Sequence, residues 1–172
     1  LRARHPGILL LNATNACELS YVPGDDLEPW EERLNDESRR IPAEWFLTQV
    51  GTELTQAVDA TATTLHVAAI TATDDSEVYE LFVPGDTALI AGESVYVEAV
   101  DAANKTLTVQ RGYIRPAAAH DAGTRIAAHI AFWPGSWLLN ASTLSPEGVL
   151  SPTMGPERWA EYNARRAAEL ME

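Results

Sequence analysis

The sequence predicts an α+β protein, mostly β, in which a small antiparallel β-barrel or sandwich is inserted into an α/β segment. Two different periodicities support this division. Residues 51–131 alternate apolar and polar side chains, which is typical of half-buried antiparallel strands. Residues 1–50 and 132–172 contain continuous apolar runs and helical patterns, which indicate buried strands and covering helices. We therefore expect the middle stretch to have a core of its own.

Two apolar runs in the outer segments predict strands. Residues 7–15, GILLLNATN, and residues 136–140, SWLLN, both contain consecutive apolar side chains that lead into an asparagine. A strand that is covered on both faces in a parallel sheet has this continuous pattern rather than an alternating one. We expect both runs to belong to one parallel sheet.

Two helices are predicted beside these strands. Residues 28–40 hold Trp30 and Leu34 four positions apart, a spacing that places both side chains on one helix face. Pro156 suits the first position of a second helix over 156–172, whose apolar residues fall on one side. Those apolar residues are Trp159, Tyr162, Ala167, Leu170 and Met171.

The strands of the middle stretch are rich in β-branched residues and are separated by turn signals. Glycine follows one strand at Gly92, and residues 101–105, DAANK, close the next hairpin. The loop 112–123 is long for a hairpin, so we expect it to lie across one end of the sheet. A closed barrel or sandwich is favoured because closure removes exposed strand edges. The predicted strands are 64–67, 87–91, 94–98, 106–109 and 124–131.

Charge and cysteine content limit the partners and the chemistry. Lys and Arg number 12 against 25 Asp and Glu, which gives a net charge of -13. This charge repels phosphate backbones and anionic lipid headgroups, so we expect neither nucleic acid nor a membrane surface as a partner. An acidic surface suits solubility, which we favour, or an extracellular setting or cation binding. The single cysteine, Cys17, excludes an intrachain disulfide and is expected to be a buried thiol.

The outer segments resemble a bacterial family of glycoside-hydrolase-like (β/α) barrels. The resemblance rests on HPGILLLNATN near the start, PAEWFLTQVG at 42–51, and FWPGSWLLNAS followed by ERWAEYNARRAAEL at 132–170. It implies incomplete (β/α)-barrel-like segments, since a complete eight-fold barrel needs about 250 residues. It also implies that the catalytic carboxylate lies on a strand after Glu172, outside this sequence. An incomplete barrel exposes apolar strand edges, which predicts self-association.

The middle stretch resembles a short β module that recurs in phage tail proteins and other surface-exposed bacterial proteins. The resemblance covers most of residues 60–127 and rests on TATTLHVA, GDTALIAGESVYVEAV, NKTLTVQRGY and AAAHDAGT. It implies a spacer or interaction role rather than an enzymatic one. It also favours an extracellular or cell-surface location.

Three tryptophans are candidate sugar-binding residues. Trp45, Trp133 and Trp137 flank the predicted outer strands. An indole ring stacks on the apolar C–H face of a sugar, and its N–H bonds a hydroxyl group. Core packing is the alternative role for these side chains.

Polar residues at the ends of the predicted strands are further candidates. Asn12, Asn15 and Asn140 offer amides to sugar hydroxyl groups, or they cap the turns that follow. Glu18 is the first of several carboxylates after the first strand, where barrel enzymes place functional groups. A solvated loop and helix face is the alternative for these acids, which are Glu18, Asp25, Asp26, Glu28, Glu31 and Glu32.

No cofactor or metal site is expected. The four histidines lie far apart in the sequence, and a phosphate-binding glycine loop is missing. The acidic string Asp74, Asp75 and Glu77 lacks a regular calcium-loop motif, and a polar turn is the favoured interpretation.

Two functions stay open at this point. The first is a fragment of a glycosidase-like, carbohydrate-active protein that binds an oligosaccharide and carries a non-catalytic β insert. The second is a non-catalytic surface, phage-tail-like or assembly module that mediates protein contacts.

Overall fold

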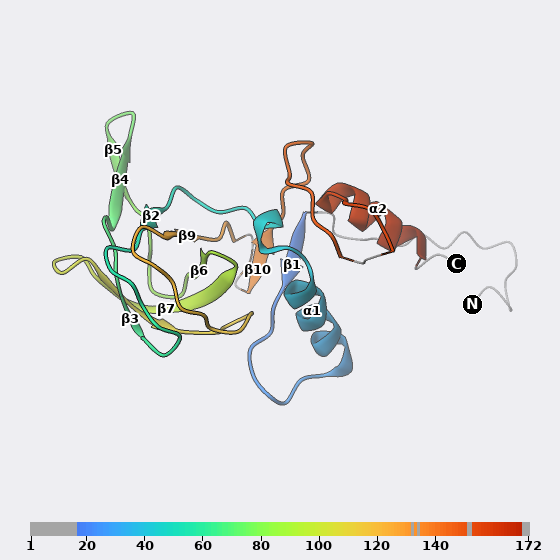
Figure 1. The fold of residues 1–172 in the computed structure, drawn as a ribbon, viewed down its shortest axis with the longest axis horizontal. Coiled ribbons are helices and arrows are strands. Elements are labelled where there is room, and N and C mark those ends of the chain that lie inside the picture. The colour runs from blue at the N-terminus through green and yellow to red at the C-terminus, as the bar shows by residue number, and fades with distance from the viewer. Residues whose placement is uncertain (1–16, 132, 134, 151–152, 170–172) are drawn as a thin grey trace, which may run out of the picture.

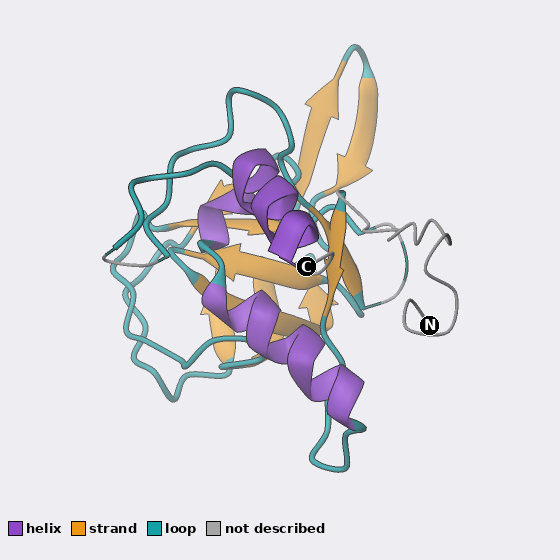
Figure 2. Cartoon of the chain, turned by 90° about the vertical axis from the view of Figure 1, so that its right-hand side faces the viewer, coloured by secondary structure: helices purple, strands orange, loops and turns teal. Residues whose placement is uncertain are grey.

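The computed structural model describes residues 17–131, 133, 135–150 and 153–169, and it shows a β-rich part joined to a smaller part that holds both α-helices (Figure 1). In Figure 2, which views the molecule from its helical end, both helices lie in front of the large sheet. The elements are β1 (Glu18–Ser20), α1 (Pro29–Arg40), a short 3₁₀ helix (Ala43–Trp45), β2 (Thr52–Glu53), β3 (Thr64–His66), β4 (Thr71–Asp74), β5 (Glu77–Glu80), β6 (Thr87–Ile90), β7 (Glu93–Asp101), β8 (Thr106–Gln110), β9 (Arg125–Ala128), β10 (Ser136–Leu138) and α2 (Trp159–Glu169).

The β-rich part is built on a six-stranded antiparallel sheet that curves into a half-barrel. Its strand order is β2-β9-β6-β7-β8-β3. Alternation along the strands buries one face, as in β8, where Leu107 and Val109 are buried while Thr108 and Gln110 are exposed. The predicted antiparallel strands of the middle stretch are therefore confirmed.

The large sheet has a hydrophobic core of its own. Every buried member of this cluster lies between residues 54 and 128, and the largest side chains come from Phe82, Leu107 and Ile126. The sheet itself draws its strands only from residues 52–128. Residues 51–131 thus supply both a sheet and a core, and their assignment as an insertion stays a prediction.

Two tight hairpins depend on residues with positive φ. The β6–β7 turn has Ala91 at φ 41° and Gly92 at φ 94°, and the β4–β5 turn has Asp75 at φ 40° and Ser76 at φ 85°. Positive φ at both central residues matches the right-handed twist of the flanking strands. The acidic string at 74–77 is therefore a polar turn, at the tip of a hairpin that projects from the body (Figure 1). The β4 and β5 strands were not predicted.

Helix α1 begins and ends as its sequence predicts. Pro29 occupies the first helical position, and the Glu28 backbone N–H donates to the Glu31 carboxylate at 2.8 Å. The two buried side chains of the helix are polar, Asn35 and Ser38, and both bond to the backbone around β1. Trp30 therefore does not face the core.

The smaller part has a second hydrophobic cluster made largely of aromatic rings. Helix α2 contributes Trp159 and Tyr162, and it begins at Trp159 rather than at Pro156. The reason is that the Glu157 backbone pairs with Gly148 in both directions, which holds the preceding residues extended. The buried members are Ile41, Trp45, Phe46, Ile114, Trp137, Leu139, Trp159 and Tyr162.

The prediction of incomplete (β/α)-barrel-like segments is wrong for the described residues. They contain two α-helices, and β10 pairs with β1 in an antiparallel two-stranded sheet rather than in a parallel one. An apolar run of five residues does not distinguish a doubly covered parallel strand from a short antiparallel strand packed on aromatic rings. The other predicted outer strand, 7–15, lies outside the described residues.

The thiol of Cys17 is exposed, which corrects the prediction of a buried one.

Candidate functional site

A groove of about 450 Å³ lies where β1, α1 and the loop after β8 meet. Its walls carry three aromatic side chains, Tyr21, Trp30 and Tyr113. The indole of Trp30 is 54% exposed and is the most accessible of these rings. The complete lining is Ser20, Tyr21, Val22, Pro23, Trp30, Leu34, Tyr113 and Gly135. We refer to it as the aromatic groove.

Helix α1 holds one wall of the aromatic groove through side-chain hydrogen bonds to the main chain. The Val22 N–H donates to the Asn35 Oδ1 at 2.8 Å, and the Asn35 Nδ2 donates to the Val22 carbonyl at 2.7 Å. The Ser38 hydroxyl donates to the Ser20 carbonyl at 2.9 Å. The amide oxygen and the amide nitrogen of Asn35 are both hydrogen-bonded, and the side chain is buried. These bonds therefore fix α1 against the segment that follows β1.

The tyrosines of the groove belong to a row of neighbouring aromatic rings that runs from Tyr96 of β7 to Trp137 of β10. Tyr113 lies 5.2 Å from Tyr21 and 5.3 Å from Tyr96 of β7, measured between ring centroids. Tyr21 lies 6.4 Å from Trp137 of β10. Burial, together with the neighbouring tyrosines, raises the pKa of Tyr113 above its usual value, so the ring stays neutral. The row makes this wall rigid.

A cation packs on the same wall. The Arg39 guanidinium lies 5.3 Å from the centre of the Tyr21 ring, and its Nη2 donates to the Tyr21 hydroxyl at 3.2 Å. This contact orients the Tyr21 ring and engages its hydroxyl oxygen.

The groove is bordered by acidic residues. The loop that runs from Pro23 to Trp30 carries Asp25, Asp26 and Glu28, all exposed. Pro23 and Trp30 both line the groove, so the loop that joins them carries these carboxylates between two lining residues, although none of the three belongs to the lining.

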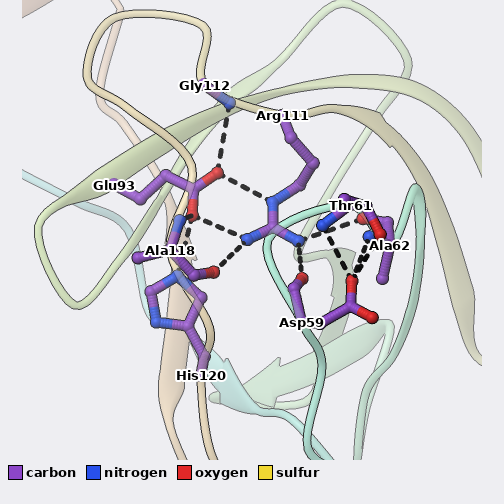
Figure 3. A network of polar contacts seen from close by, with 8 residues as sticks. All are labelled: Asp59, Thr61, Ala62, Glu93, Arg111, Gly112, Ala118 and His120. Atoms are coloured by element: carbon purple, nitrogen blue, oxygen red, sulfur yellow. Dashed lines mark hydrogen bonds and ion pairs between the residues drawn. The ribbon is translucent and has the colours of Figure 1, made fainter.

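A second polar cluster is centred on Glu93, at the start of β7 (Figure 3). The Arg111 Nε and Nη2 donate to its two carboxylate oxygens at 2.7 and 2.8 Å, and the His120 Nε2 lies 2.8 Å from Oε2. The backbone N–H groups of Gly112 and Ala118 also donate to it, at 3.1 and 3.0 Å. Burial alone would raise the pKa of Glu93, but these bonds outweigh it and lower the pKa to about 2.

The Glu93 cluster has a structural role. Arg111 also donates to the carbonyls of Asp59, Ala62 and Ala118 at 2.8, 3.0 and 2.6 Å, so one guanidinium ties three segments together. A carboxylate that is ionised and surrounded by fixed donors offers no proton and no free oxygen for catalysis. The cluster instead holds the loop 112–120 against the sheet. His120 joins the cluster through its Nε2, which lies 2.8 Å from Glu93 Oε2.

His129 is a third polar group of interest, because it is buried between the rings of Phe46 and Trp137, at 5.4 and 5.8 Å. Among the described residues, neither ring nitrogen finds a hydrogen-bond partner of ordinary geometry. Burial, reinforced by the positive charge of Arg115, lowers the pKa of His129 to about 3. The imidazole is therefore neutral.

The structure separates the tryptophans predicted to bind sugar. Trp45 and Trp137 are 0% and 2% exposed, and the Trp45 Nε1 donates to the Pro146 carbonyl at 2.8 Å. Their ring faces are covered by the core, which favours the packing alternative. Trp133 is 63% exposed, and it is the one member of the three with an accessible indole.

The predicted polar site residues also lie apart. Glu18 is in β1, where its Oε2 accepts from the Ser136 hydroxyl at 3.0 Å. Asn140 caps a turn, because its Oδ1 accepts from the Ser142 N–H at 3.1 Å and from the Ser142 hydroxyl. Asn12 and Asn15 lie outside the described residues. The structure brings Glu18 close to the Trp133 backbone through Ser136, and it assembles no site from the remaining candidates.

The residues of the aromatic groove were missed at the sequence level. In the sequence, Trp30 stands out only by its four-residue spacing from Leu34 on a predicted helix, and Tyr21 and Tyr113 lie in segments without periodicity. The available signal was a tryptophan one residue after the proline that starts a helix, close to a run of acids.

Comparison with known proteins gives no relative for this chain. No protein-family model matches it, and a search of curated proteins finds no similar sequence.

In the part of the chain that the structure describes, no group of three or more His, Cys, Asp or Glu side chains could hold a metal ion. None of the described helices is long and apolar enough to cross a membrane.

Proposed function

We propose that the described part of the chain is a non-catalytic binding module that contacts other proteins through the aromatic groove. The observation that carries the proposal is the exposed indole of Trp30 on a rigid wall beside Tyr21 and Tyr113. Tryptophan and tyrosine supply most of the binding energy in protein interfaces, and they do so where their rings line a pocket. Single exposed apolar residues are common, whereas a groove lined by three rings is a feature of recognition sites.

The buried polar groups support a non-catalytic role. A glycosidase needs two carboxyl groups across the scissile bond, one protonated and one ionised. The buried carboxylate of Glu93 is ionised and is bonded to Arg111, to His120 and to two backbone N–H groups. In this proposal the Glu93 carboxylate holds the loop 112–120 against the sheet and takes no part in catalysis. This favours the assembly-module interpretation over the glycosidase-like one.

A selection from a random peptide library on the immobilised chain tests the proposal. We expect selected peptides whose affinity falls about tenfold or more in Trp30→Ala, the effect of removing a central aromatic contact. Trp133→Ala is the matched control, because it removes an indole of similar exposure that is outside the groove lining, and it should leave the affinity unchanged. Absence of peptide ligands, or hydrolysis of aryl glycosides by the purified chain, would overturn the proposal.

Carbohydrate binding is the second candidate, and it rests on Trp133. The Trp133 backbone N–H donates to the Ser136 hydroxyl, which donates to the Glu18 carboxylate, so the residue that carries this exposed indole is close to an acidic side chain. A glycan array distinguishes the two candidates. Glycan binding that is lost in Trp133→Ala and kept in Trp30→Ala would support the second candidate.

Self-association stays a separate prediction, which light scattering at high protein concentration checks.

A further inference from the structure

The main chain along the aromatic groove is already hydrogen-bonded. The N–H and the carbonyl of Val22 are both paired with Asn35, and the Ser20 carbonyl accepts from Ser38. The Tyr21 N–H donates to the Gly135 carbonyl at 2.9 Å. A peptide that adds a strand to a sheet edge gains its affinity from main-chain hydrogen bonds. These pairings leave little for such a ligand, so strand addition is disfavoured here.

The size of the groove disfavours a helical ligand. An α-helix with its side chains is about 10–12 Å across. The aromatic groove, at about 450 Å³, is near the small end of ligand sites and suits a few ring-sized side chains. The remaining mode is an extended ligand that binds through side chains alone.

We propose that the aromatic groove binds a basic, proline-rich peptide segment in the polyproline II conformation. This inference rests on the proposed function and names its partner class. A polyproline II segment has no internal hydrogen bonds, and its prolines lack N–H groups, so it needs few main-chain partners. Its rings pack on tryptophan and tyrosine, and its preformed shape lowers the entropy lost on binding.

Charge selects among proline-rich ligands. Asp25, Asp26 and Glu28 lie on the loop that joins two lining residues of the groove, and the whole chain carries a net charge of -13. An arginine or lysine that follows the prolines would meet these carboxylates, whereas an acidic ligand would be repelled. The binding should therefore weaken as salt concentration rises.

Titration calorimetry of the full chain with three synthetic peptides tests the inference. The probe is Ac-PPRPPRPPR-NH2, and the controls are Ac-PPEPPEPPE-NH2 and Ac-GGRGGRGGR-NH2. We expect binding of the probe alone, weaker by about tenfold or more in Trp30→Ala and unchanged in Trp133→Ala. Far-UV circular dichroism and a thermal melt check that both variants are folded, which the exposure of both indoles predicts.

The outcomes distinguish failure of the inference about a proline-rich ligand from failure of the proposed function. Equal binding of the glycine and proline peptides would show that charge alone acts, and the inference would fall. The inference would also fall, with the proposed function intact, if the probe did not bind but library-selected peptides without proline did so in a Trp30-dependent way. Loss of all peptide binding would remove both.

Discussion

The carboxylate of Glu93 and the guanidinium of Arg111 face each other in a two-point ion pair inside the β-rich part, with Arg111 donating through Nε and Nη2 at 2.7 and 2.8 Å. Both side chains are almost fully buried. The pair joins the start of β7 to the end of β8, and through them it fixes the loop that carries Tyr113 into the aromatic groove. The wall of the aromatic groove therefore depends on an ion pair whose two residues are not part of the groove lining.

Breaking this pair should destabilise the protein strongly. Arg111→Ala leaves the Glu93 carboxylate buried without its main counter-ion, and removing one partner of a buried pair costs about 3–5 kcal/mol. Urea unfolding followed by circular dichroism measures the change. The matched control is Glu98→Gln, an exposed carboxylate on the same strand, for which we expect a change within about 0.5 kcal/mol. Equal stability of Arg111→Ala and the parent chain would contradict a structural role for the cluster.

His129 should make the protein less stable in mild acid. The pKa of His129 is about 3 in the folded chain, against an ordinary histidine value of 6.5, so below pH 6.5 the unfolded chain binds a proton that the folded chain does not. As the pH is lowered from 6.5 to 3, the free energy of unfolding should then fall by about 1.4 kcal/mol for each pH unit. Glu93 adds no loss in the upper part of this window, because its pKa is lowered from 4.5 and its contribution is lost only below that pH.

Urea unfolding at pH 7 and pH 5 measures this dependence. His129→Leu should remove most of the loss, because an apolar side chain replaces a buried ring whose nitrogens have no hydrogen-bond partner of ordinary geometry among the described residues. The charged group that faces His129 is Arg115, which does not titrate in this range. His66→Gln, at an exposed histidine, should retain the dependence. If His129→Leu kept the full loss, the acid sensitivity would have another source.

Gly51 should tolerate no side chain. A Cβ atom at this position would lie 2.4 Å from the Ile126 carbonyl oxygen and 2.7 Å from the Ala127 Cβ, because the segment before β2 runs directly against β9. We expect Gly51→Ala to lower the free energy of unfolding by about 1–3 kcal/mol, the usual cost of overpacking. Gly155→Ala is the control, since nothing lies within 4 Å of its added Cβ. A thermal melt in which both variants match the parent chain would show that β9 and residue 51 are not in contact.

The tryptophans should divide into structural and accessible groups. Trp137→Ala removes a buried ring and should cost about 3–5 kcal/mol, whereas Trp133→Ala should change stability by less than about 0.5 kcal/mol. Acrylamide quenching of tryptophan fluorescence gives an independent measure, because loss of an exposed indole lowers the quenchable fraction. A stable Trp137→Ala variant would argue against the aromatic cluster of the smaller part.

Local patterns in the sequence were enough to locate most elements. Period-two alternation located β3, β7 and β8, since one-sided burial leaves its pattern in the order of the residues. Turn and loop signals before them located β6 and β9. The four-residue spacing of Trp30 and Leu34 located α1. The pattern was weak for β4 and β5, because a projecting hairpin buries little on either face.

The contacts that form the aromatic groove could not be predicted from local patterns in the sequence. Asn35 and Ser38 look like ordinary polar helix residues, yet they are the buried ones, while Trp30 is exposed. Which helix face packs depends on the partner strand, and β1 presents main-chain groups that bond to amide and hydroxyl side chains. Hydrophobicity alone favours burial of Trp30 and Leu34, which lie on a neighbouring face of the helix.

By itself the sequence determined the antiparallel β-rich middle, the two helices and the exclusion of a disulfide within the chain. Each of these follows from residue types and from neighbours within a few positions. The tertiary structure alone decided that β10 pairs antiparallel with β1, that Glu93 meets Arg111 and His120, and that Tyr21, Trp30 and Tyr113 line one groove. These contacts join residues far apart along the chain, and the free energy that selects them comes from packing and desolvation of the whole fold rather than from any one segment.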